Sequence, residues 1–454
     1  SFHSLKVMTQ ELWAIIDHLE YYYQNIILPT ISKVFEIAVK NRLLNHLQTN
    51  KLIHPNQYGF MKNSNTTTAA SCLVNDIVNG MNRKKKAACI FLDVKKAFDC
   101  LNFDILDRRL MEVGVEDKAR AVLKNYMSGR KQVVVVDEKR SFESNVVVGA
   151  AQGSILGPLL FLIYINDLLF LKLNSIRRLF ADDGAFSYEA ENYKALYKKM
   201  HEDICVIQSF LASLNLEMSI KKTLFMIFRT TNSSSEGLFN KLYFNDTFIE
   251  KVDSFKYLGL HIDSRFDWKE HVNQISSKIS PYVGILRRIR HCVDTNTLMQ
   301  IYYSFIHSRL IYCLPVWSHC SMELKMRLQR LQNKAIKFIH FKPHLTPSTE
   351  LYDEKFLSFL QLCDYEPIFF IYKVSTGLVK CDVDLLTNEQ ITGRQTRQSS
   401  HLRLPQYLMS KSQDSVFYRG LKLFNNYKSC SKFSHETSLS DIKRSIKRFV
   451  CNQL

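Results

Sequence analysis

The sequence predicts an α+β fold, in which a mixed domain is followed by helical additions. Short apolar runs bounded by turn residues alternate with amphipathic helical patterns up to about residue 265, and only helical patterns follow. The chain has 454 residues, of which 46% are hydrophobic, so it can bury two or three sizeable cores. This composition excludes a disordered tail.

The mixed part contains a buried strand and three hairpins. Residues 87–92, AACIFL, form a continuous apolar run, which is typical of a buried strand that ends at Asp93. The hairpins pair apolar runs around polar turns: 132–136 and 144–148 around DEKR, 178–181 and 185–188 around Asp182 to Gly184, and 242–244 and 248–252 around Asn245 and Asp246. Helices are predicted over 103–113 and 193–214, and strands over 224–228 and 257–262.

The second part is predicted to be helical. Residues 270–289, 297–312 and 322–339 have apolar positions at spacings of three and four. Residues 155–173 are as apolar as a short membrane span, but they include Asn166, Asp167 and Lys172, and a central charge costs about 3 kcal/mol on insertion. A buried helix entered through Gly157 and Pro158 is therefore favoured. The clearest linker signal is TTNSSSEG at 230–237, although a loop within one domain explains it equally well.

Charge and cysteine content limit the partners and the compartment. The formal net charge of +18 favours a polyanionic partner such as nucleic acid, although a basic surface that keeps the protein soluble is an equal alternative. The 11 scattered cysteines favour a reducing intracellular compartment, nuclear or cytoplasmic, and argue against a structural metal. The chain begins without Met and without a leader, which leaves a fragment of a longer protein open.

Adjacent aspartates in FADDGAF point to a bound cation. Asp182 and Asp183 repel each other, so a site that keeps both ionised needs a positive ion such as Mg²⁺. A lone Asp-Asp-Gly turn is ordinary, but Asp93 also closes a buried strand. If that strand pairs with the Asp182 hairpin, three carboxylates meet at one sheet edge and can hold two ions for nucleotidyl transfer.

Three segments resemble motifs A, B and C of reverse transcriptases, in the right order: FLDVKKAFD at 91–99, AQGSILGPLLFLIYINDL at 151–168 and FADD at 180–183. The nearest resemblance is to non-LTR retrotransposon enzymes of the LINE-type, jockey-like group. Further segments resemble the fingers region from Ile31, its second motif QYGFMKNSNTT from Gln57, motif D from Leu214 and motif E from Phe255. Residues 1–26 match nothing.

The resemblance implies a right-hand polymerase with an antiparallel palm sheet. Its fingers and palm would cover 27–262, a helical thumb 263–345 and a mainly helical family-specific region 346–454. Such an enzyme is an RNA-directed DNA polymerase that takes an RNA template, a DNA primer or target, dNTPs and two Mg²⁺ ions, with Mn²⁺ as a substitute. No membrane partner is expected.

The resemblance also assigns roles to individual residues. Asp93, Asp182 and the carbonyl of Val94 would bind metal, with Asp183 completing the cluster. Phe98, which the pattern alone makes a helix core residue, would be the steric gate under the sugar. The remaining assignments are nucleotide or template contacts at Lys62, Gln152, Gly153 and Ser154, a general acid at Lys222, and a primer grip at Leu258 and Gly259, which otherwise are strand residues.

Departures from the family pattern favour an alternative. Met61 stands where the family usually has an Arg that grips the triphosphate, and Ala151, Ser219 and Phe424 replace a customary Pro, Asn and Trp. An N-terminally truncated, partly degenerate copy would explain this drift, and a nucleic-acid-binding remnant without catalysis is the rival. A group II intron or telomerase-type polymerase is a further alternative, weakened because the C-terminal tail resembles that of retrotransposons. A metal-dependent nuclease is another, weakened because it gives no reason for motifs B and E.

Overall fold

The structure is a computed structural model, and it describes residues 30–137, 139–151, 153–229, 240–354, 356–383, 385–395, 398–407, 413–430 and 438–453. The described chain forms two compact units. The first consists of residues up to His54, 96–167 and 212–216, and the second of 55–95, 168–211 and 217–454. The N-terminal segment 1–26, for which no resemblance was found, and the predicted linker 230–237 lie outside the described residues.

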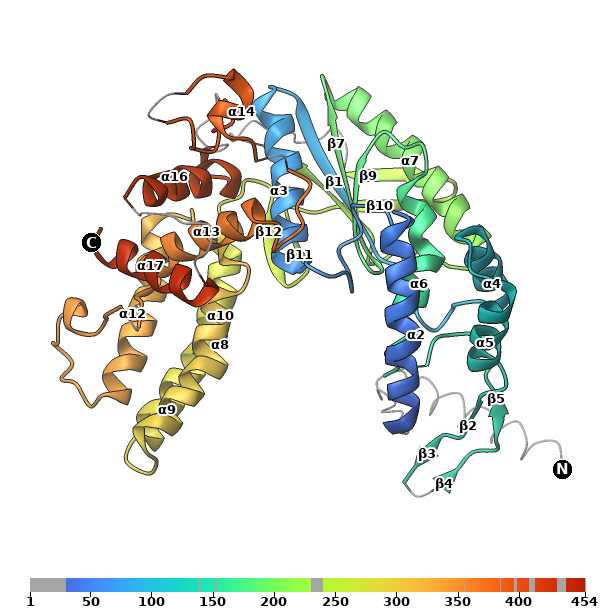
Figure 1. Ribbon diagram of the computed structural model, residues 1–454, viewed down its shortest axis with the longest axis horizontal. Helices are drawn as coiled ribbons and strands as arrows, with labels where there is room; N and C mark the ends of the chain where they lie inside the picture. The colour runs from blue at the N-terminus through green and yellow to red at the C-terminus, as the bar shows by residue number, and fades with distance from the viewer. Residues whose placement is uncertain are drawn as a thin grey trace. The chain divides into compact units, whose positions relative to one another are not determined.

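The second unit is built on a six-stranded sheet with the strand order β6-β7-β1-β8-β10-β9. Strands β1, β7, β9 and β10 of this sheet are labelled in Figure 1. Neighbouring strands are antiparallel except β8 and β10, which are parallel. A separate hairpin is formed by β11 and β12. The strands are β1 (Lys86–Leu92), β6 (Ile176–Phe180), β7 (Asp183–Ala190), β8 (Leu224–Phe228), β9 (Lys241–Phe244), β10 (Thr247–Lys251), β11 (Ser254–Tyr257) and β12 (Leu260–Asp263).

Strand β1 is central because six consecutive apolar residues bury both of its faces. One face packs with helix α3 (Thr66–Asn82), which also contacts β6 and β7. The same core includes the β11–β12 hairpin, since the ring of Phe91 stacks on that of Phe255 at 4.3 Å between centroids. The end of β1 is thereby held rigidly at Asp93.

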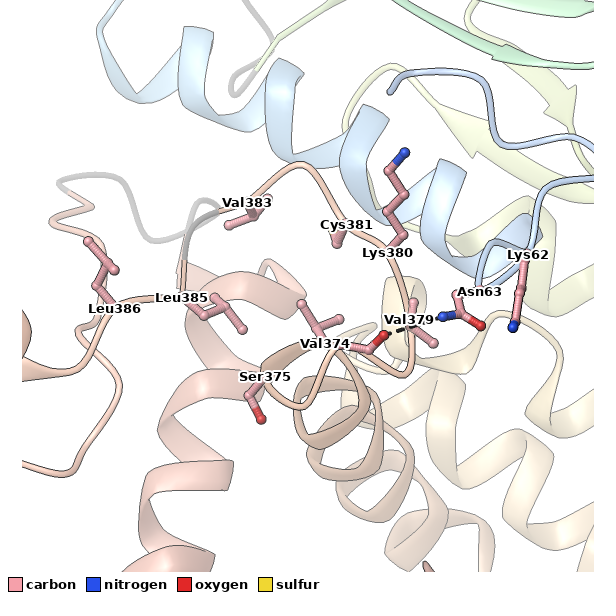
Figure 2. A pocket seen from close by; sticks show the side chains of 11 residues that line it. Lys62, Asn63, Val374, Ser375, Val379, Lys380, Cys381, Val383, Leu385 and Leu386 are labelled. Atoms are coloured by element: carbon pink, nitrogen blue, oxygen red, sulfur yellow. Dashed lines mark hydrogen bonds between the residues drawn. The ribbon is translucent and has the colours of Figure 1, made fainter. Parts of the chain in front are cut away.

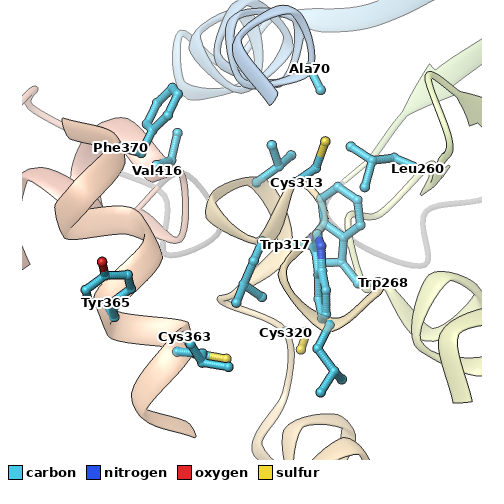
Figure 3. Close-up of a cluster of buried hydrophobic side chains, with 14 of the residues drawn as sticks. Ala70, Leu260, Trp268, Cys313, Trp317, Cys320, Cys363, Tyr365, Phe370 and Val416 are labelled. Atoms are coloured by element: carbon cyan, nitrogen blue, oxygen red, sulfur yellow. The ribbon is translucent and has the colours of Figure 1, made fainter. Parts of the chain in front are cut away.

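The rest of the second unit is helical. Its helices are α7 (Tyr193–Ser213), α8 (Lys269–Ile289), α9 (Thr295–Tyr302), the π-helical turn η2 (Tyr303–His307), α10 (Ser308–Ile311), α11 (Leu314–Trp317), α12 (Met322–Ile339), η3 (Ser348–Glu350), α13 (Phe359–Ser375), α14 (Asn388–Thr392), the π-helical turn η4 (Val416–Gly420), α16 (Leu421–Cys430) and α17 (Leu439–Cys451). Trp268 and Trp317 are fully buried in their common core (Figure 3).

Helix α3 is covered by residues from the far end of the chain. Asn75 and Asn79 both accept hydrogen bonds from the hydroxyl of Tyr407, at 3.2 and 2.8 Å. The Sγ atoms of Cys72 and Cys381 lie 2.9 Å apart, and α3 also contacts α11 and η4. The C-terminal residues therefore form part of the same core as the sheet.

The first unit contains helices and two small antiparallel ladders. Its elements are α2 (Thr30–Thr49), α4 (Phe103–Glu112), α5 (Asp117–Met127), α6 (Gly157–Ile165), η1 (Asn166–Leu169, which ends in the second unit), β2 (Lys131–Gln132), β3 (Val135–Val136), β4 (Lys139–Arg140) and β5 (Ser144–Asn145). The fully buried carboxylate of Glu36 accepts the amides of Ile155 and Leu156, which lie just before α6. This contact stabilises the start of α6, whose first amides lack helical partners.

The α+β fold and the change to helices after residue 263 confirm the sequence prediction. Residues 157–165 form the predicted buried helix, and none of the described helices is long and apolar enough to cross a membrane. Two hairpin turns were placed wrongly. The turn predicted over DEKR has two residues instead of four, because Lys139 and Arg140 belong to the return strand β4. The turn predicted over Asp182 to Gly184 has two residues instead of three, because Asp183 begins β7.

The predicted single strand over 257–262 is also wrong. Tyr257 pairs with Leu260, so Leu258 and Gly259 form a two-residue hairpin turn. Both have positive φ, 46° and 83°, which is the requirement of a tight hairpin turn. All eleven cysteines are free thiols.

Candidate active site at the end of the central strands

Antiparallel pairing of β1 with β7 brings the predicted carboxylates together. Leu92 lies opposite Gly184, so the next position in the same register places Asp93 opposite Asp183. Directly opposed residues have their side chains on the same face of a sheet. Asp182 occupies the adjoining turn, between Phe180 and Asp183. Three aspartates from two distant segments are therefore neighbours at one end of the sheet.

The backbone beyond β1 directs the carbonyl of Val94 toward the same place. The amide and carbonyl of Asp93 bond to Thr223 and Ser219, and the amide of Lys95 bonds to Glu217. In an extended chain, the polar groups of successive residues point to opposite edges. Because Asp93 and Lys95 face the 217–223 segment, the carbonyl of Val94 faces the β7 edge.

The turn that carries Asp182 is conformationally demanding. Ala181, the residue before Asp182, has φ of +59°, a region that residues other than glycine rarely adopt. The side-chain oxygen of Gln57 accepts hydrogen bonds from the amides of both Ala181 and Gly59, each at 3.0 Å. Gln57 is almost completely buried, at 1% exposure. Its amide group therefore stabilises the turn through two polar contacts.

Gly59 permits this close approach. A Cβ atom at this position would lie 2.3 Å from the amide nitrogen of Ala181, which is closer than any real contact. The sequence indicated Gln57 and Gly59 only as members of a motif, and no role was predicted for either. The signal that could have found them is a buried amide next to a glycine, since buried polar groups are hydrogen-bonded.

We expect Gln57→Ala to lower the turnover of nucleotide addition by about 10- to 100-fold, because the turn would shift once two buried amides lose their acceptor. The binding constant for a primer–template duplex should stay within about twofold of the original value, since Gln57 does not reach the surface. Steady-state primer extension and fluorescence anisotropy measure the two quantities. Gln208→Ala, which removes the acceptor of a hydrogen bond from the exposed Asn245, is the matched control. An equal effect of both variants would contradict a positioning role.

The closeness of the three carboxylates affects their electrostatics. Partial burial is the largest cause of the raised pKa of Asp182 and Asp183, and the charge of Asp93 raises both further. The pKa of Asp183 rises to about 6, because Asp182 adds its own charge. A cation bound among these groups would remove their repulsion.

The donor atoms at this place suit a hard divalent ion. Carboxylates at 93, 182 and 183 and a backbone carbonyl at 94 are oxygen ligands of the kind that Mg²⁺ and Mn²⁺ prefer. Over the described ranges, no group of three or more His, Cys, Asp or Glu side chains is gathered closely enough to hold a metal ion. Binding there would require the three neighbouring carboxylates to turn toward a common point.

A buried ion pair lies beneath the carboxylate turn. The guanidinium of Arg178, 2% exposed on β6, makes a two-point contact with Asp76 of α3, at 2.5 Å from Nε and 2.8 Å from Nη2. It also donates to the hydroxyl of Tyr58 and lies 3.7 Å from Asp382. Burial raises the pKa of Asp76, and the hydrogen bonds and charge of Arg178 oppose that rise. This network was not predicted from the sequence.

Residues predicted from motif B and the steric gate belong to the first unit. Phe98 lies in a turn over 95–100 rather than in the expected helix, and its ring packs on Phe161 at 4.5 Å between centroids. Gly153 has φ of +78°, a conformation that favours glycine, and the hydroxyl of Ser154 accepts the amide of Gly157. Gln152 lies outside the described residues.

The remaining predicted residues belong to the second unit. Lys222 is exposed and precedes Thr223, whose hydroxyl accepts the amide of Asp93, so the chain holds Lys222 near the carboxylates. The carbonyl of Leu258 accepts the hydroxyl of Tyr312 at 2.6 Å, and the ring of Tyr312 lies against Gly259. The predicted primer-grip turn is thus held by a residue that directly follows α10 and lies more than fifty positions away.

Lys62 lies in a different environment from the carboxylates. It lines an open pocket of about 510 Å³ together with Asn63 and residues 374–386 (Figure 2). The carbonyl of Asn63 accepts the amide of Lys380 at 2.8 Å. The loop that follows Met61 therefore packs against a C-terminal segment.

An antiparallel sheet with aspartates at a hairpin turn and at the end of the adjacent strand is typical of palm domains, in which carboxylates and divalent ions act on phosphate esters. Residues 22–262 match the family described as reverse transcriptase (RNA-dependent DNA polymerase), which is more than half of the chain. The chain belongs to this family.

Two similar proteins come from mobile elements of Drosophila melanogaster. The chain is 25% identical to a probable RNA-directed DNA polymerase from transposon X-element, over 69% of this chain and 35% of that protein. It is 24% identical to the RNA-directed DNA polymerase from mobile element jockey, over 70% of this chain and 35% of that protein. The chain thus spans about a third of these relatives. Among solved structures it is similar to telomerase from Candida tropicalis bound to a telomeric RNA fragment, with a TM-score of 0.43 and 15% identity over 98% of this chain and 59% of that chain.

Proposed function

We propose that this chain is an RNA-directed DNA polymerase that extends a DNA 3′ end along an RNA template, by two-metal nucleotidyl transfer. The observation that carries the proposal is the strand register that places Asp93 opposite Asp183 and beside Asp182. Membership of the reverse transcriptase family supports it. The substrates are an RNA template, a DNA primer or target and dNTPs, which meet inside the cell, in the nucleus or the cytoplasm.

Asp93, Asp182 and the carbonyl of Val94 would hold two Mg²⁺ ions, or Mn²⁺ in their place, and Asp183 would complete the acidic cluster. When bound, such ions lower the pKa of the attacking hydroxyl and neutralise the leaving pyrophosphate. The protein fixes the geometry, because the Asp93 amide and carbonyl are both hydrogen-bonded and the turn at Ala181 is held by Gln57. Lys222 would donate a proton to the pyrophosphate.

Substrate contacts are proposed for six further residues. Phe98 would exclude a 2′-hydroxyl, and Gln152 and Gly153 would contact template and nucleotide. Leu258 and Gly259 would support the primer end, at a turn fixed by Tyr312. Lys62 is proposed to bind the triphosphate in place of the usual arginine.

Primer extension on an RNA template tests the polymerase. Labelled DNA should be extended only with dNTPs and Mg²⁺ or Mn²⁺ present, and chelation should stop it. Binding of the duplex without any extension would instead support the nucleic-acid-binding remnant, which is favoured by Met61 at the position of the usual arginine. In that case Met61→Arg should restore measurable extension if the lost arginine is the defect.

We expect Asp183→Asn to stabilise the metal-free protein while it abolishes extension. The pKa of Asp183 in the folded chain, about 6, is above that of an unfolded aspartate, so its charge at pH 7 opposes folding. Removing that charge should raise the free energy of unfolding by on the order of 1 kcal/mol after allowance for solvent screening, or the melting temperature by roughly 2 °C. Thermal melting in chelator measures this change. Added Mg²⁺ should stabilise the original chain more than the variant, and an equal response would contradict a metal site here.

A further inference from the structure

A second cavity lies among the C-terminal helices of the second unit. Its volume is about 720 Å³, within the range of small-ligand pockets, and its walls come from η2, residues 354–357, the first half of α13 and the helix α17. The wall formed by η2 is a π-helical turn, a rare irregularity that occurs often at functional sites. None of its lining residues is among the carboxylates or the predicted substrate contacts.

One wall of the cavity is strongly basic. Helix α17 buries Ile442, Ile446 and Val450 against its neighbours, and its cavity side carries Lys443, Arg444, Lys447 and Arg448. The spacing of four between members of each pair places them in two rows along the helix. Two of the cations have exposed acidic partners, Arg444 with Asp441 at 3.3 Å and Arg448 with Glu354 at 3.0 Å. Exposed pairs of this kind are weak, so they exchange readily for a phosphate.

Aromatic rings form the facing part of the cavity. Tyr303 is 43% exposed, and its ring meets that of Phe356 edge-on at 6.2 Å between centroids. Tyr365 stacks on Phe369 at 5.9 Å, and the ammonium of Lys443 lies 5.4 Å from the centre of the Phe369 ring. Basic side chains next to aromatic faces are the combination that single-stranded nucleic acid needs, since phosphates meet cations and bases stack on rings.

Besides Glu354, a second acidic residue, Glu366, lines this basic and aromatic cavity. It lies on α13 between Tyr365 and Pro367, and burial raises its pKa to about 7 despite the opposing charges of Lys373 and Lys443. Its side chain is partly exposed and lines the cavity, so its carboxylate oxygens can accept a hydrogen bond from a ligand that supplies an N–H group.

We propose that this cavity binds one nucleotide of a single-stranded nucleic acid, with α17 holding the phosphates, the aromatic wall contacting the base and Glu366 accepting a hydrogen bond from an exocyclic amino group. Cytosine is the base that a carboxylate acceptor recognises by its N4 amino group, whereas uracil presents an oxygen at the same position. The site should therefore prefer cytosine to uracil. It lies outside the catalytic site and does not depend on the proposed polymerase activity.

The test uses the full chain with Asp182→Ala, so that loss of catalysis cannot affect the result. An excess of unlabelled primer–template duplex occupies the polymerase groove, and the anisotropy of two labelled ten-nucleotide RNAs is measured: oligouridylate, and the same strand with alternate cytidines. We expect the cytidine strand to bind about tenfold more tightly. Matching DNA strands show whether the 2′-hydroxyl contributes.

Variants separate the base contact from the phosphate contacts. Glu366→Gln should reduce the cytidine preference to less than about twofold, because the amide can accept from the amino group of cytosine and can equally donate to the O4 oxygen of uracil. Lys443→Ala should weaken both strands and lower the slope of log Kd against log salt by about 0.7. Tyr303→Ala, at a position that is 43% exposed, should weaken binding of both strands. Lys422→Ala, at an exposed position on the neighbouring helix α16, is the matched control and should have no effect.

Two outcomes would overturn the proposal. One is an unchanged cytidine preference in Glu366→Gln, together with an effect of Lys443→Ala no larger than that of Lys422→Ala. The other is that none of the variants weakens the binding of either strand, whereas a decapeptide of glutamates binds the α17 face. That result would identify a protein partner. Thermal melting of each variant shows that it is folded.

Discussion

Asp182→Ala is expected to reduce primer extension by at least about 1,000-fold, which corresponds to roughly 4 kcal/mol of transition-state stabilisation. The carboxylate of Asp182 lies at a turn beside the end of β1, where Asp93 and the carbonyl of Val94 face the same edge. Asp182 is one of the proposed oxygen ligands, so its removal would weaken binding of a cation that would neutralise charge on the phosphate. Single-nucleotide addition to a labelled DNA primer on an RNA template measures the loss.

A matched control lies in the same sheet. Asp246 occupies the two-residue turn between β9 and β10, so Asp246→Ala also removes an aspartate from a tight hairpin. It should leave extension within about twofold, and both variants should bind the primer–template duplex as the original chain does. If Asp182→Ala retained more than about a tenth of the original rate, the proposed site would be wrong.

Asp76→Ala is expected to lower the free energy of unfolding of the second unit by about 3–5 kcal/mol, because it leaves the buried guanidinium of Arg178 without its main partner. Asp382, at 3.7 Å and more than half exposed, is too distant and too well hydrated to replace it. Chemical denaturation followed by the fluorescence of the buried Trp268 and Trp317 measures the change, since both residues report on this unit.

The double variant Asp76→Leu with Arg178→Met should recover most of the lost stability, since an apolar pair of similar volume removes both charges. Lys198→Ala is the control, because its pair with Glu202 at 3.8 Å is exposed and should contribute less than about 0.5 kcal/mol. A loss in Asp76→Ala no greater than that in Lys198→Ala would show that Arg178 is solvated after all.

Most strands and helices could be predicted because their sequences are locally consistent. The run at 87–92 has no polar residue, and the helices after residue 268 keep their apolar spacing. The errors fall at turns whose backbone is set from a distance. Leu258 adopts a positive φ that its own sequence disfavours, and a hydrogen bond from Tyr312 holds its carbonyl in place.

The candidate site likewise contains residues that the sequence could predict and residues that it could not. Asp93, Asp182 and Asp183 follow or interrupt apolar strands, so their clustering could be inferred from the sequence once pairing was assumed. Gln57 and the ion pair of Arg178 could not, because their partners are more than a hundred residues away. An arginine inside the apolar run IRRLF was nevertheless a usable signal, since buried charges require partners.

The contacts that residues after 370 make with helix α3 have a consequence for how the C-terminal region evolves. Cys381 and Tyr407 meet the helix that supports the central strands, so a nonsense codon beyond the last strand would remove packing from beneath the carboxylates. Selection for DNA synthesis would then preserve this tail as strictly as the motifs themselves, and shortened expression clones that stop after Ile339 should yield insoluble protein.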